Sequence, residues 1–344
     1  MEIIKYNHSV KVFRSIILDQ YFKGMTLGIF DIETLGLSPS KCPIILAGLM
    51  SVYPDGFCEI TQYFAESPKE EKIMLEALQT ELDKFDYLIT YNGKHFDLPF
   101  IKKRAEVCAV EDFYVKPYNF DLYLCVNGHS DLKKFLPNLK QKSVEEYMGV
   151  GVSREDEISG KESIDLYYKY LSTFEKKQKA DLKQRILLHN HDDLLQLYKI
   201  LPVLKQVNIH SALSALGFPV AGLNGWPQLN VCNAKIKDHE LNIYGTYSGE
   251  PFLFSCYSNP EMPYDCSFTL DREFFFSLQL ESIKGNCFLN VSEILGDTFS
   301  FEKYPGYVNG FLLLSSAVGL NYLEINMCSK ALLQKFMLDN SMPA

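Results

Sequence analysis

The chain of 344 residues is 47% hydrophobic, which is enough to bury the cores of two ordinary domains and is not typical of a disordered protein. No apolar run reaches the roughly 18 residues of a membrane span, and residues 1–11 mix charged with apolar side chains, so we expect a cytoplasmic protein without a membrane segment or signal peptide. The formal net charge of −9 argues against non-specific coating of nucleic acid, although it leaves room for a local basic groove.

The cysteines are scattered along the chain without a CxxC pair. Their odd count of 9 fits reduced thiols in a reducing compartment better than disulfides or a zinc site. We therefore expect most of them to be small core residues.

The first part of the chain alternates strand-like and helical patterns. A short helix is expected within 11–21. The following elements are a strand at 26–33, a hairpin at 43–52 and 57–64, a helix at 68–84, a strand at 87–92 and a helix from 95 to about 107. The turn signal Tyr53-Pro54-Asp55-Gly56 separates the hairpin strands, and Ser67-Pro68 is typical of a helix start. This order predicts an α/β fold, a mixed sheet flanked by helices.

The pattern becomes helical after residue 121 and strand-like after Val207. Ser143 with Glu146 predicts a short capped helix, and Ser172 with Glu175 predicts the start of a long helix that continues to about residue 201. Beyond it, short apolar runs at 230–235, 240–247, 251–257, 273–280 and 311–314 are broken by Gly, Pro, Asn and Asp. We expect one domain at 1–206 and a β-rich antiparallel domain at 207–344, with a terminal helix at 329–338.

Two carboxylates mark the end of the first predicted strand of the mixed sheet. Because side chains alternate along a strand, Asp31 and Glu33 emerge on one face while Phe30 and Ile32 emerge on the other. Adjacent buried carboxylates need a cation, and a divalent metal is the simplest one. The alternative is a solvated strand end.

Two further stretches carry acidic residues. Asp97 lies where a strand meets a helix, a position that also suits a plain helix cap. The block 189–193 interrupts the apolar stripe of the long helix, and its His189 and Asp193 share a helical face. Such a block is either solvated or part of a site.

Together these stretches resemble the DEDD exonuclease superfamily with its ribonuclease H-like domain, and most closely its bacterial YprB-like branch. The matching motifs are Phe30-Asp31-Ile32-Glu33-Thr34, Tyr91-Asn92-Gly93-Lys94-x-Phe96-Asp97 and Asn190-x-x-Asp193. The resemblance covers about 25–202 and implies 3′ to 5′ hydrolysis of single-stranded nucleic acid. It departs from the superfamily at His189, which stands where a tyrosine belongs, whereas the histidine type has a different spacing.

The implied mechanism uses two Mg²⁺ or Mn²⁺ ions, which suit hard oxygen ligands. The metal ligands would be Asp31 bridging both ions, Glu33 and Asp193 on the ion that activates water, and Asp97 on the second ion. His189 is the candidate base that accepts the proton of the attacking water. The alternatives on the same helix are His191 for the base and Asp192 for a carboxylate.

The expected partner is nucleic acid, RNA or DNA, bound at a single-stranded 3′ end, and the oligomeric state is left open. The candidate substrate contacts are Tyr91, Asn92, Lys140 and Lys161, the last by resemblance alone. Basic residues cluster at 133–142 and 176–185, and the second cluster also fits a solvated helix face. Aromatic residues of the β-rich domain could stack bases, although alternating aromatics in a sheet more often form a core.

Two rival functions remain. A non-catalytic nucleic-acid-binding or scaffold protein could keep the same fold. A structure-specific endonuclease could use the same metal site.

Overall fold

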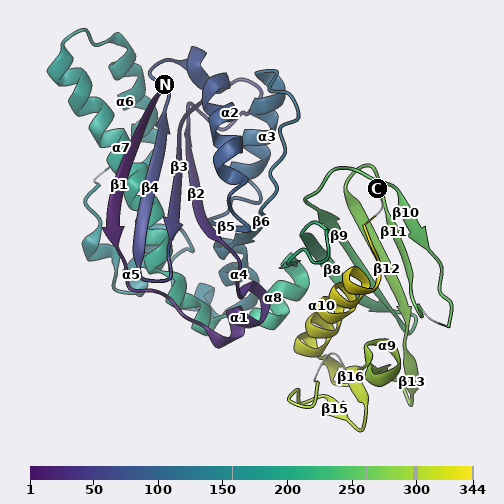
Figure 1. Ribbon diagram of the computed structural model, residues 1–344. Coiled ribbons are helices and arrows are strands. Elements are labelled where there is room, and N and C mark those ends of the chain that lie inside the picture. The colour runs from purple at the N-terminus through teal and green to yellow at the C-terminus, as the bar shows by residue number, and fades with distance from the viewer. Residues whose placement is uncertain (157, 261, 297–300, 343–344) are drawn as a thin grey trace. The chain divides into compact units, whose positions relative to one another are not determined.

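The computed structural model describes residues 1–156, 158–260, 262–296 and 301–342. The chain divides into two compact units, shown in Figure 1. Unit 1 comprises Met1–Ile16 and Gly24–Val207, and unit 2 comprises Ile17–Lys23 and Asn208–Ala344. Most of the short helix α1 (Ile16–Phe22) therefore belongs with the C-terminal half of the chain, which its sequence did not indicate.

Unit 1 is built on a mixed sheet, as the sequence predicts. Its six strands follow the order β1-β4-β3-β2-β5-β6. The strands are β1 (Glu2–Ser9), β2 (Leu27–Thr34), β3 (Ile44–Val52), β4 (Phe57–Phe64), β5 (Tyr87–Thr90) and β6 (Tyr118–Asp121). The pairs β2–β5 and β5–β6 are parallel, whereas the pairs β1–β4, β4–β3 and β3–β2 are antiparallel. The edge strand β1 and strand β6 are additions to the predicted elements.

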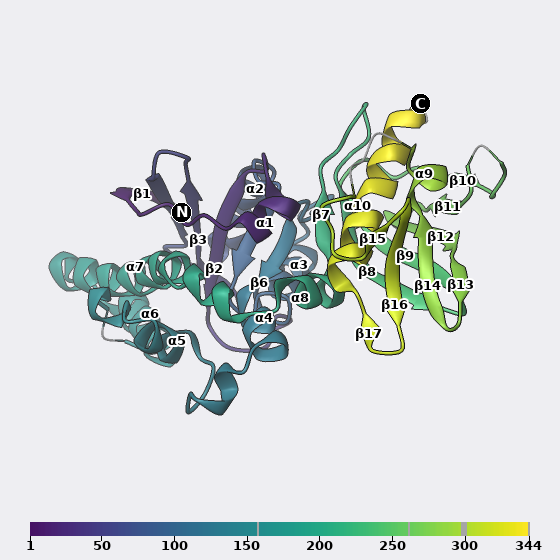
Figure 2. The same ribbon diagram turned by 90° about the horizontal axis from the view of Figure 1, so that it is seen from below.

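Helices cover both faces of this sheet (Figure 2). Phe30 and Ile32 of β2 belong to an apolar cluster with α2 (Glu71–Leu82) and α3 (Asp97–Val107). The opposite face is covered by α7 (Lys176–Lys199), which packs on β2, β3 and β4. Because side chains alternate along β2, Asp31 and Glu33 point toward α7 on the opposite face.

Helix α7 approaches the sheet closely because β3 carries a glycine. A Cβ atom on Gly48 would lie 2.2 Å from Asn190 Oδ1, so a larger residue would push the helix away. Gln62 of β4 donates to Asn190 Oδ1 at 2.8 Å and to Leu187 O at 2.9 Å. These contacts fix the rotation of α7, and hence which of its residues face β2.

Two predicted helices of unit 1, α5 (Gln141–Tyr147) and α7, start at other residues than expected. The elements of unit 1 not yet described are α4 (Leu122–His129), α6 (Gly160–Ser172) and 3₁₀ turns at Pro68–Glu70, Leu132–Lys134, Gly151–Ser153 and Leu201–Gln206. Ser143 lies inside α5, and the cap of α7 is Glu175, which accepts from two backbone N–H groups. The true capping box is Ser159 with Glu162 at the start of α6.

Unit 2 is antiparallel and β-rich, as predicted. Its sheets follow the orders β10-β11-β12-β9-β8-β7 and β13-β14-β16-β15, with β17 paired to β16. The strands are β7 (Phe218–Val220), β8 (Leu229–Lys237), β9 (Glu240–Tyr247), β10 (Phe254–Cys256), β11 (Asp265–Phe268), β12 (Glu273–Gln279), β13 (Glu281–Ile283), β14 (Asn286–Asn290), β15 (Tyr307–Val308), β16 (Phe311–Ser316) and β17 (Gly319–Leu320).

Besides α1, the described residues of unit 2 form the helices α8 (Ile209–Leu216), α9 (Val291–Ile294) and α10 (Tyr322–Asp339), the last longer than predicted. Phe274 and Phe276 are fully buried, and Phe276 packs edge-on against Phe336 of α10. These aromatic side chains therefore form a core and are not available to stack bases.

A half-buried lysine joins α10 to α1 within unit 2. Lys330 Nζ donates to Gln20 O at 2.7 Å and Tyr21 O at 3.1 Å, and burial lowers the pKa of Lys330 from 10.5 to about 8. Between these values the folded protein holds fewer protons than the unfolded chain, so its stability rises with pH across that window.

We expect the parent to gain roughly 1–3 kcal/mol of unfolding free energy relative to Lys330→Met as pH rises through this window. Groups shared by both proteins cancel in the difference. Urea unfolding of both full-length proteins at the two ends of the window measures it, and a pH-independent difference would show that Lys330 does not titrate in this way.

Candidate active site

The carboxylates of β2 lie under helix α7. Asn190 Nδ2 donates to Asp31 Oδ2 at 2.8 Å, which holds that carboxylate against the helix. Glu33 is buried two residues further along the same face. The two acids are therefore not on a solvated strand end: Glu33 is buried and Asp31 is half-buried beneath α7.

Asp97 reaches the same region from the first turn of α3. It is not a plain helix cap, because Phe96 occupies the cap position and Asp97 Oδ1 instead accepts from Ile32 N of β2 at 3.2 Å. The preceding turn is fixed by Asp121, whose carboxylate accepts from Asn92 N at 3.0 Å and Lys94 N at 2.9 Å. Asn92 has a positive φ of 68°, which asparagine tolerates better than most residues.

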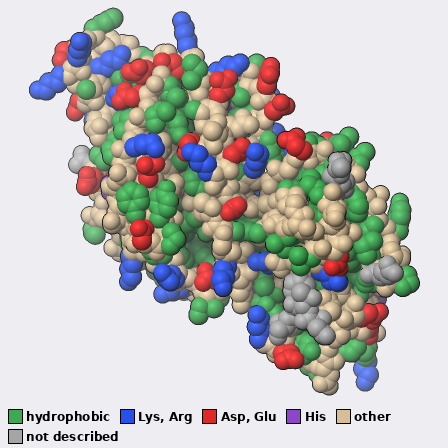
Figure 3. Space-filling view, viewed as in Figure 1, with side chains coloured by type: hydrophobic (Ala, Val, Ile, Leu, Met, Phe, Trp, Pro, Cys, Tyr) green, Lys and Arg blue, Asp and Glu red, His purple; other side chains and the backbone are tan. Residues whose placement is uncertain are grey.

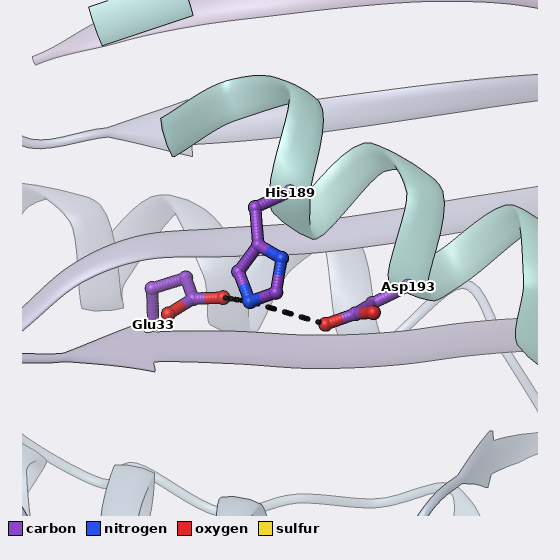
Figure 4. A group of neighbouring side chains, drawn as sticks. All are labelled: Glu33, His189 and Asp193. Atoms are coloured by element: carbon purple, nitrogen blue, oxygen red, sulfur yellow. Dashed lines mark ion pairs between the residues drawn. The ribbon is translucent and has the colours of Figure 1, made fainter. Parts of the chain in front are cut away.

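Helix α7 contributes His189 and Asp193. Figure 4 shows the imidazole lying between Glu33 and Asp193, with His189 Nε2 3.6 Å from both Glu33 Oε1 and Asp193 Oδ2. Within the described residues, these three side chains form a group whose donor atoms all lie within 4.8 Å of one another, close enough to hold a metal ion. His189, Asn190 and Asp192 of the polar block are buried and Asp193 is 22% exposed at its side chain, so the block is not a solvated helix face.

The four carboxylates repel one another in this buried setting. Burial and the charges of Asp97, Asp193 and Glu33 raise the pKa of Asp31 well above its ordinary value. Burial likewise raises the pKa of Glu33 and of Asp97 to about 7, and raises that of Asp193. Burial alone would lower the pKa of His189, but its hydrogen bond to Asp156 and the nearby carboxylates raise it to about 9.

A loop before α6 supplies residues that sequence reasoning missed. Arg154 is 7% exposed at its side chain and donates from Nη2 to Asp193 Oδ1 at 2.6 Å, while its Nε and Nη2 pair with Glu145. Asp156 Oδ2 lies 2.7 Å from His189 Nδ1. Burial opposes the ionisation of Asp156, but the hydrogen bonds from His189 and Arg154 lower its pKa to about 2.

The other candidates on α7 have different partners. His191 Nε2 contacts His8 Nε2 at 2.8 Å, and its Nδ1 lies 3.1 Å from Asp192 Oδ1. Asp192 Oδ2 accepts from the backbone N–H groups of Glu155 at 2.5 Å and Asp156 at 2.9 Å. The structure thus brings His189, and not His191, to Glu33 and Asp193.

Three of the four candidate substrate residues share a cavity. Tyr91, Asn92 and Lys140 line a space of about 710 Å³ together with Tyr123 and Gln141. Gln141 Nε2 donates to the backbone O of Asp193 at 2.9 Å, which links one lining residue of the cavity to the helix that carries His189 and Asp193. The fourth candidate, Lys161, lies exposed on the first turn of α6 and does not line this cavity.

Several residues of the two basic clusters have acidic or aromatic partners. Lys183 pairs with Glu2, Lys179 lies over the Tyr170 ring, and Lys134 pairs with Asp131. On the face shown in Figure 3, basic and acidic side chains are interspersed. Among the described residues, no helix is long and apolar enough to cross a membrane.

The donor set of the cluster fits Mg²⁺ or Mn²⁺. Carboxylate oxygens from Asp31, Glu33, Asp97 and Asp193 are the hard ligands that these ions prefer. Burial is the largest cause of their raised pKa values, and the charges of Asp97, Asp193 and Glu33 add repulsion at Asp31. A divalent cation would relieve this repulsion.

A family model described as the RNase_H superfamily matches residues 29–205, just over half of the chain. The chain therefore belongs to the RNase_H superfamily. The matched residues include the whole carboxylate cluster.

The chain is also 29% identical over 172 residues to the uncharacterized protein YprB of Bacillus subtilis (strain 168), which confirms the resemblance to that branch. The alignment covers 50% of this chain and 40% of YprB, so the chain matches less than half of its relative's length. Among solved structures, the family B DNA polymerase from the hyperthermophilic archaeon Pyrobaculum calidifontis matches with a TM-score of 0.42 and 22% identity, over 56% of this chain and 26% of the polymerase.

Proposed function

We propose that this protein is a metal-dependent 3′ to 5′ exonuclease acting on single-stranded nucleic acid. The observation that carries the proposal is the convergence of Asp31, Glu33, Asp97 and Asp193 on one buried cluster beside His189. A scaffold that only kept the fold would not need such mutually repelling acids. The domain division at about residue 206 is part of the same proposal, because every one of these residues precedes it.

The protein's own residues would perform the following tasks. Asp31, Glu33, Asp97 and Asp193 would hold two Mg²⁺ or Mn²⁺ ions, which when bound supply charge stabilisation to the reacting phosphodiester and acidify water. His189 Nε2 is directed into the space between Glu33 and Asp193, where it would take the proton of the attacking water. Bound cations would offset the charges of Glu33 and Asp193 and so remove their contribution to the raised pKa of His189, which would favour the neutral imidazole that accepts this proton.

The cavity beside the cluster would hold the terminal nucleotide of the substrate. The Tyr91 and Tyr123 rings lie 5.8 Å apart at one wall, and Lys140 adds positive charge there. Tyr91 donates its hydroxyl proton to Leu139 O at 2.5 Å, so its ring has a fixed position. Tyr123 is the better residue to test, because no such contact would be lost with it.

We expect Tyr123→Ala to raise KM by about tenfold, because stacking of one base on an aromatic ring contributes about 1–3 kcal/mol. Tyr168→Ala is the matched control, since Tyr168 is an exposed tyrosine of α6 in the same unit. Steady-state kinetics on a short single strand measures both. Equal KM values for the two variants would remove the cavity from the substrate path.

The exonuclease proposal is tested against the rival functions with linear and circular single strands. A circular strand has no end, so an exonuclease degrades only the linear form. We expect hydrolysis of the linear strand in Mn²⁺ or Mg²⁺ and no hydrolysis in a chelator. Cleavage of the circle would identify an endonuclease, and binding without cleavage of either strand would identify a non-catalytic binding protein.

A further inference from the structure

The loop of residues 153–156, called here the clamp loop, is fastened to one face of α7. Ser153 Oγ accepts from Gln196 Nε2 at 2.8 Å and from Lys199 Nζ at 2.9 Å. Asp192 Oδ2 accepts from the backbone N–H groups of Glu155 and Asp156 in the same loop. Residues 192, 196 and 199 are spaced so that they lie on the same side of a helix. The loop therefore runs along α7 at a defined register.

This attachment presents two loop side chains to the carboxylate cluster. Asp156 Oδ2 is hydrogen-bonded to His189 Nδ1 at 2.7 Å, so the other ring nitrogen, Nε2, is directed at Glu33 and Asp193. Arg154 Nη2 donates to Asp193 Oδ1 at 2.6 Å, and the second oxygen, Asp193 Oδ2, faces His189. In both His189 and Asp193, one polar atom is therefore held by the loop and the other is directed into the carboxylate cluster.

Arg154 is itself held in place by neighbouring acids. Its guanidinium forms a two-point pair with Glu145 at 3.0 and 2.7 Å, and Nη1 reaches Asp156 Oδ1 at 2.6 Å. The side chains of Glu145 and Asp156 are each 1% exposed. A planar guanidinium can bridge three carboxylates in this way, whereas an ammonium group offers no such fork.

We propose that Arg154 and Asp156 are positioning residues: Asp156 sets the orientation of the His189 imidazole, and Arg154 fixes the carboxylate of Asp193 for metal binding. The proposal rests on the nuclease function proposed above. Partners that orient a ligand or a base from outside the ligand set typically contribute about 10–100-fold in metal affinity or activity. The two residues should therefore affect different measured quantities.

The test compares Asp156→Asn and Arg154→Lys with the parent. Glu146→Gln is the control, because it neutralises an exposed acid on α5 next to Glu145. Arg154→Lys keeps the positive charge, so a change in metal affinity reports the loss of geometry. Thermal unfolding of each full-length variant shows that the fold is retained.

We expect Asp156→Asn to lower kcat by about 10–100-fold, while KM and the Mn²⁺ dissociation constant measured by titration calorimetry stay close to the parent's. Arg154→Lys should weaken Mn²⁺ binding by about tenfold. A crystal structure of Asp156→Asn should show the His189 ring turned or in two orientations. Glu146→Gln should match the parent throughout.

Parent-like kcat and an unchanged His189 ring in Asp156→Asn would overturn the role of Asp156, and parent-like Mn²⁺ affinity in Arg154→Lys would overturn that of Arg154. A parent that binds Mn²⁺ but hydrolyses no nucleic acid would refute the proposed function alone. In that case calorimetry and the His189 orientation still decide the positioning roles.

Discussion

Asp31→Asn is expected to lower the rate of metal-dependent hydrolysis by at least about 10²–10³-fold, the range typical for removing one electrostatic contact to a transition state. Asp31 occupies the centre of the cluster, since the charges of Asp97, Asp193 and Glu33 all act on it. Asparagine keeps the size of the side chain and can still accept the Asn190 hydrogen bond. The variant therefore removes charge with little change in packing.

The same substitution should have the opposite effect on stability without metal. Burial and like charges hold the pKa of Asp31 above its unfolded value, so its ionisation destabilises the folded protein at neutral pH. We expect the metal-free Tm of Asp31→Asn to stay level or to rise, by about 2–4 °C for each kcal/mol of relief. Mn²⁺ should then raise the Tm of the parent more than that of the variant.

Thermal scans with and without Mn²⁺ measure both effects. Asp165→Asn is the control, because it makes the same charge change at an exposed position on α6. Equal Mn²⁺-induced shifts in the parent and in Asp31→Asn, together with retained activity, would refute the assignment of Asp31 as a metal ligand.

His189→Ala is expected to lower kcat by about 10²–10⁴-fold, the usual cost of losing a positioned general base. His189 is 5% exposed, and its Nε2 faces both Glu33 and Asp193. The matched variant is His191→Ala, whose ring contacts His8 and Asp192 instead. That variant should retain kcat within about threefold of the parent, because it removes no group that faces the cluster.

Metal affinity separates two roles for His189. A base leaves the Mn²⁺ dissociation constant nearly unchanged when it is removed, whereas a metal ligand weakens binding. The grouping of His189 with Glu33 and Asp193 makes both roles geometrically accessible. We expect parent-like Mn²⁺ affinity with reduced kcat in His189→Ala. If His191→Ala is the impaired variant, or if neither is, the water is not activated by His189.

Local periodicity explains why much of the cluster was predictable. The alternation of β2 placed Asp31 and Glu33 on one face, and the four-residue spacing on α7 placed His189 with Asp193. Asp97 depended on its motif, because its partner is the backbone of Ile32, a residue 65 positions away. A sequence pattern cannot reveal such a contact by itself.

Arg154 and Asp156 were missed for the same physical reason. They lie in a loop without periodicity, and they meet Asp193 and His189 across separations of 39 and 33 residues. The only local signal was a charged stretch after the turn at Gly149-x-Gly151.

Strand β1 was missed because it is an edge strand whose exposed residues include Lys5, Asn7 and Ser9. The helix caps were misplaced because several Ser-x-x-Glu stretches compete, and among the described helices the capping box forms at Ser159.

The central claim is tested most directly by the products formed from a single strand of RNA or DNA carrying a label at its 5′ end, incubated with the parent and Mn²⁺. Removal of one nucleotide at a time from the 3′ end predicts a ladder of labelled products that shortens in steps, and Asp31→Asn should give no ladder. Immediate release of a labelled mononucleotide would show the opposite polarity. Intact RNA and DNA after incubation with a parent that binds Mn²⁺ would contradict the exonuclease account.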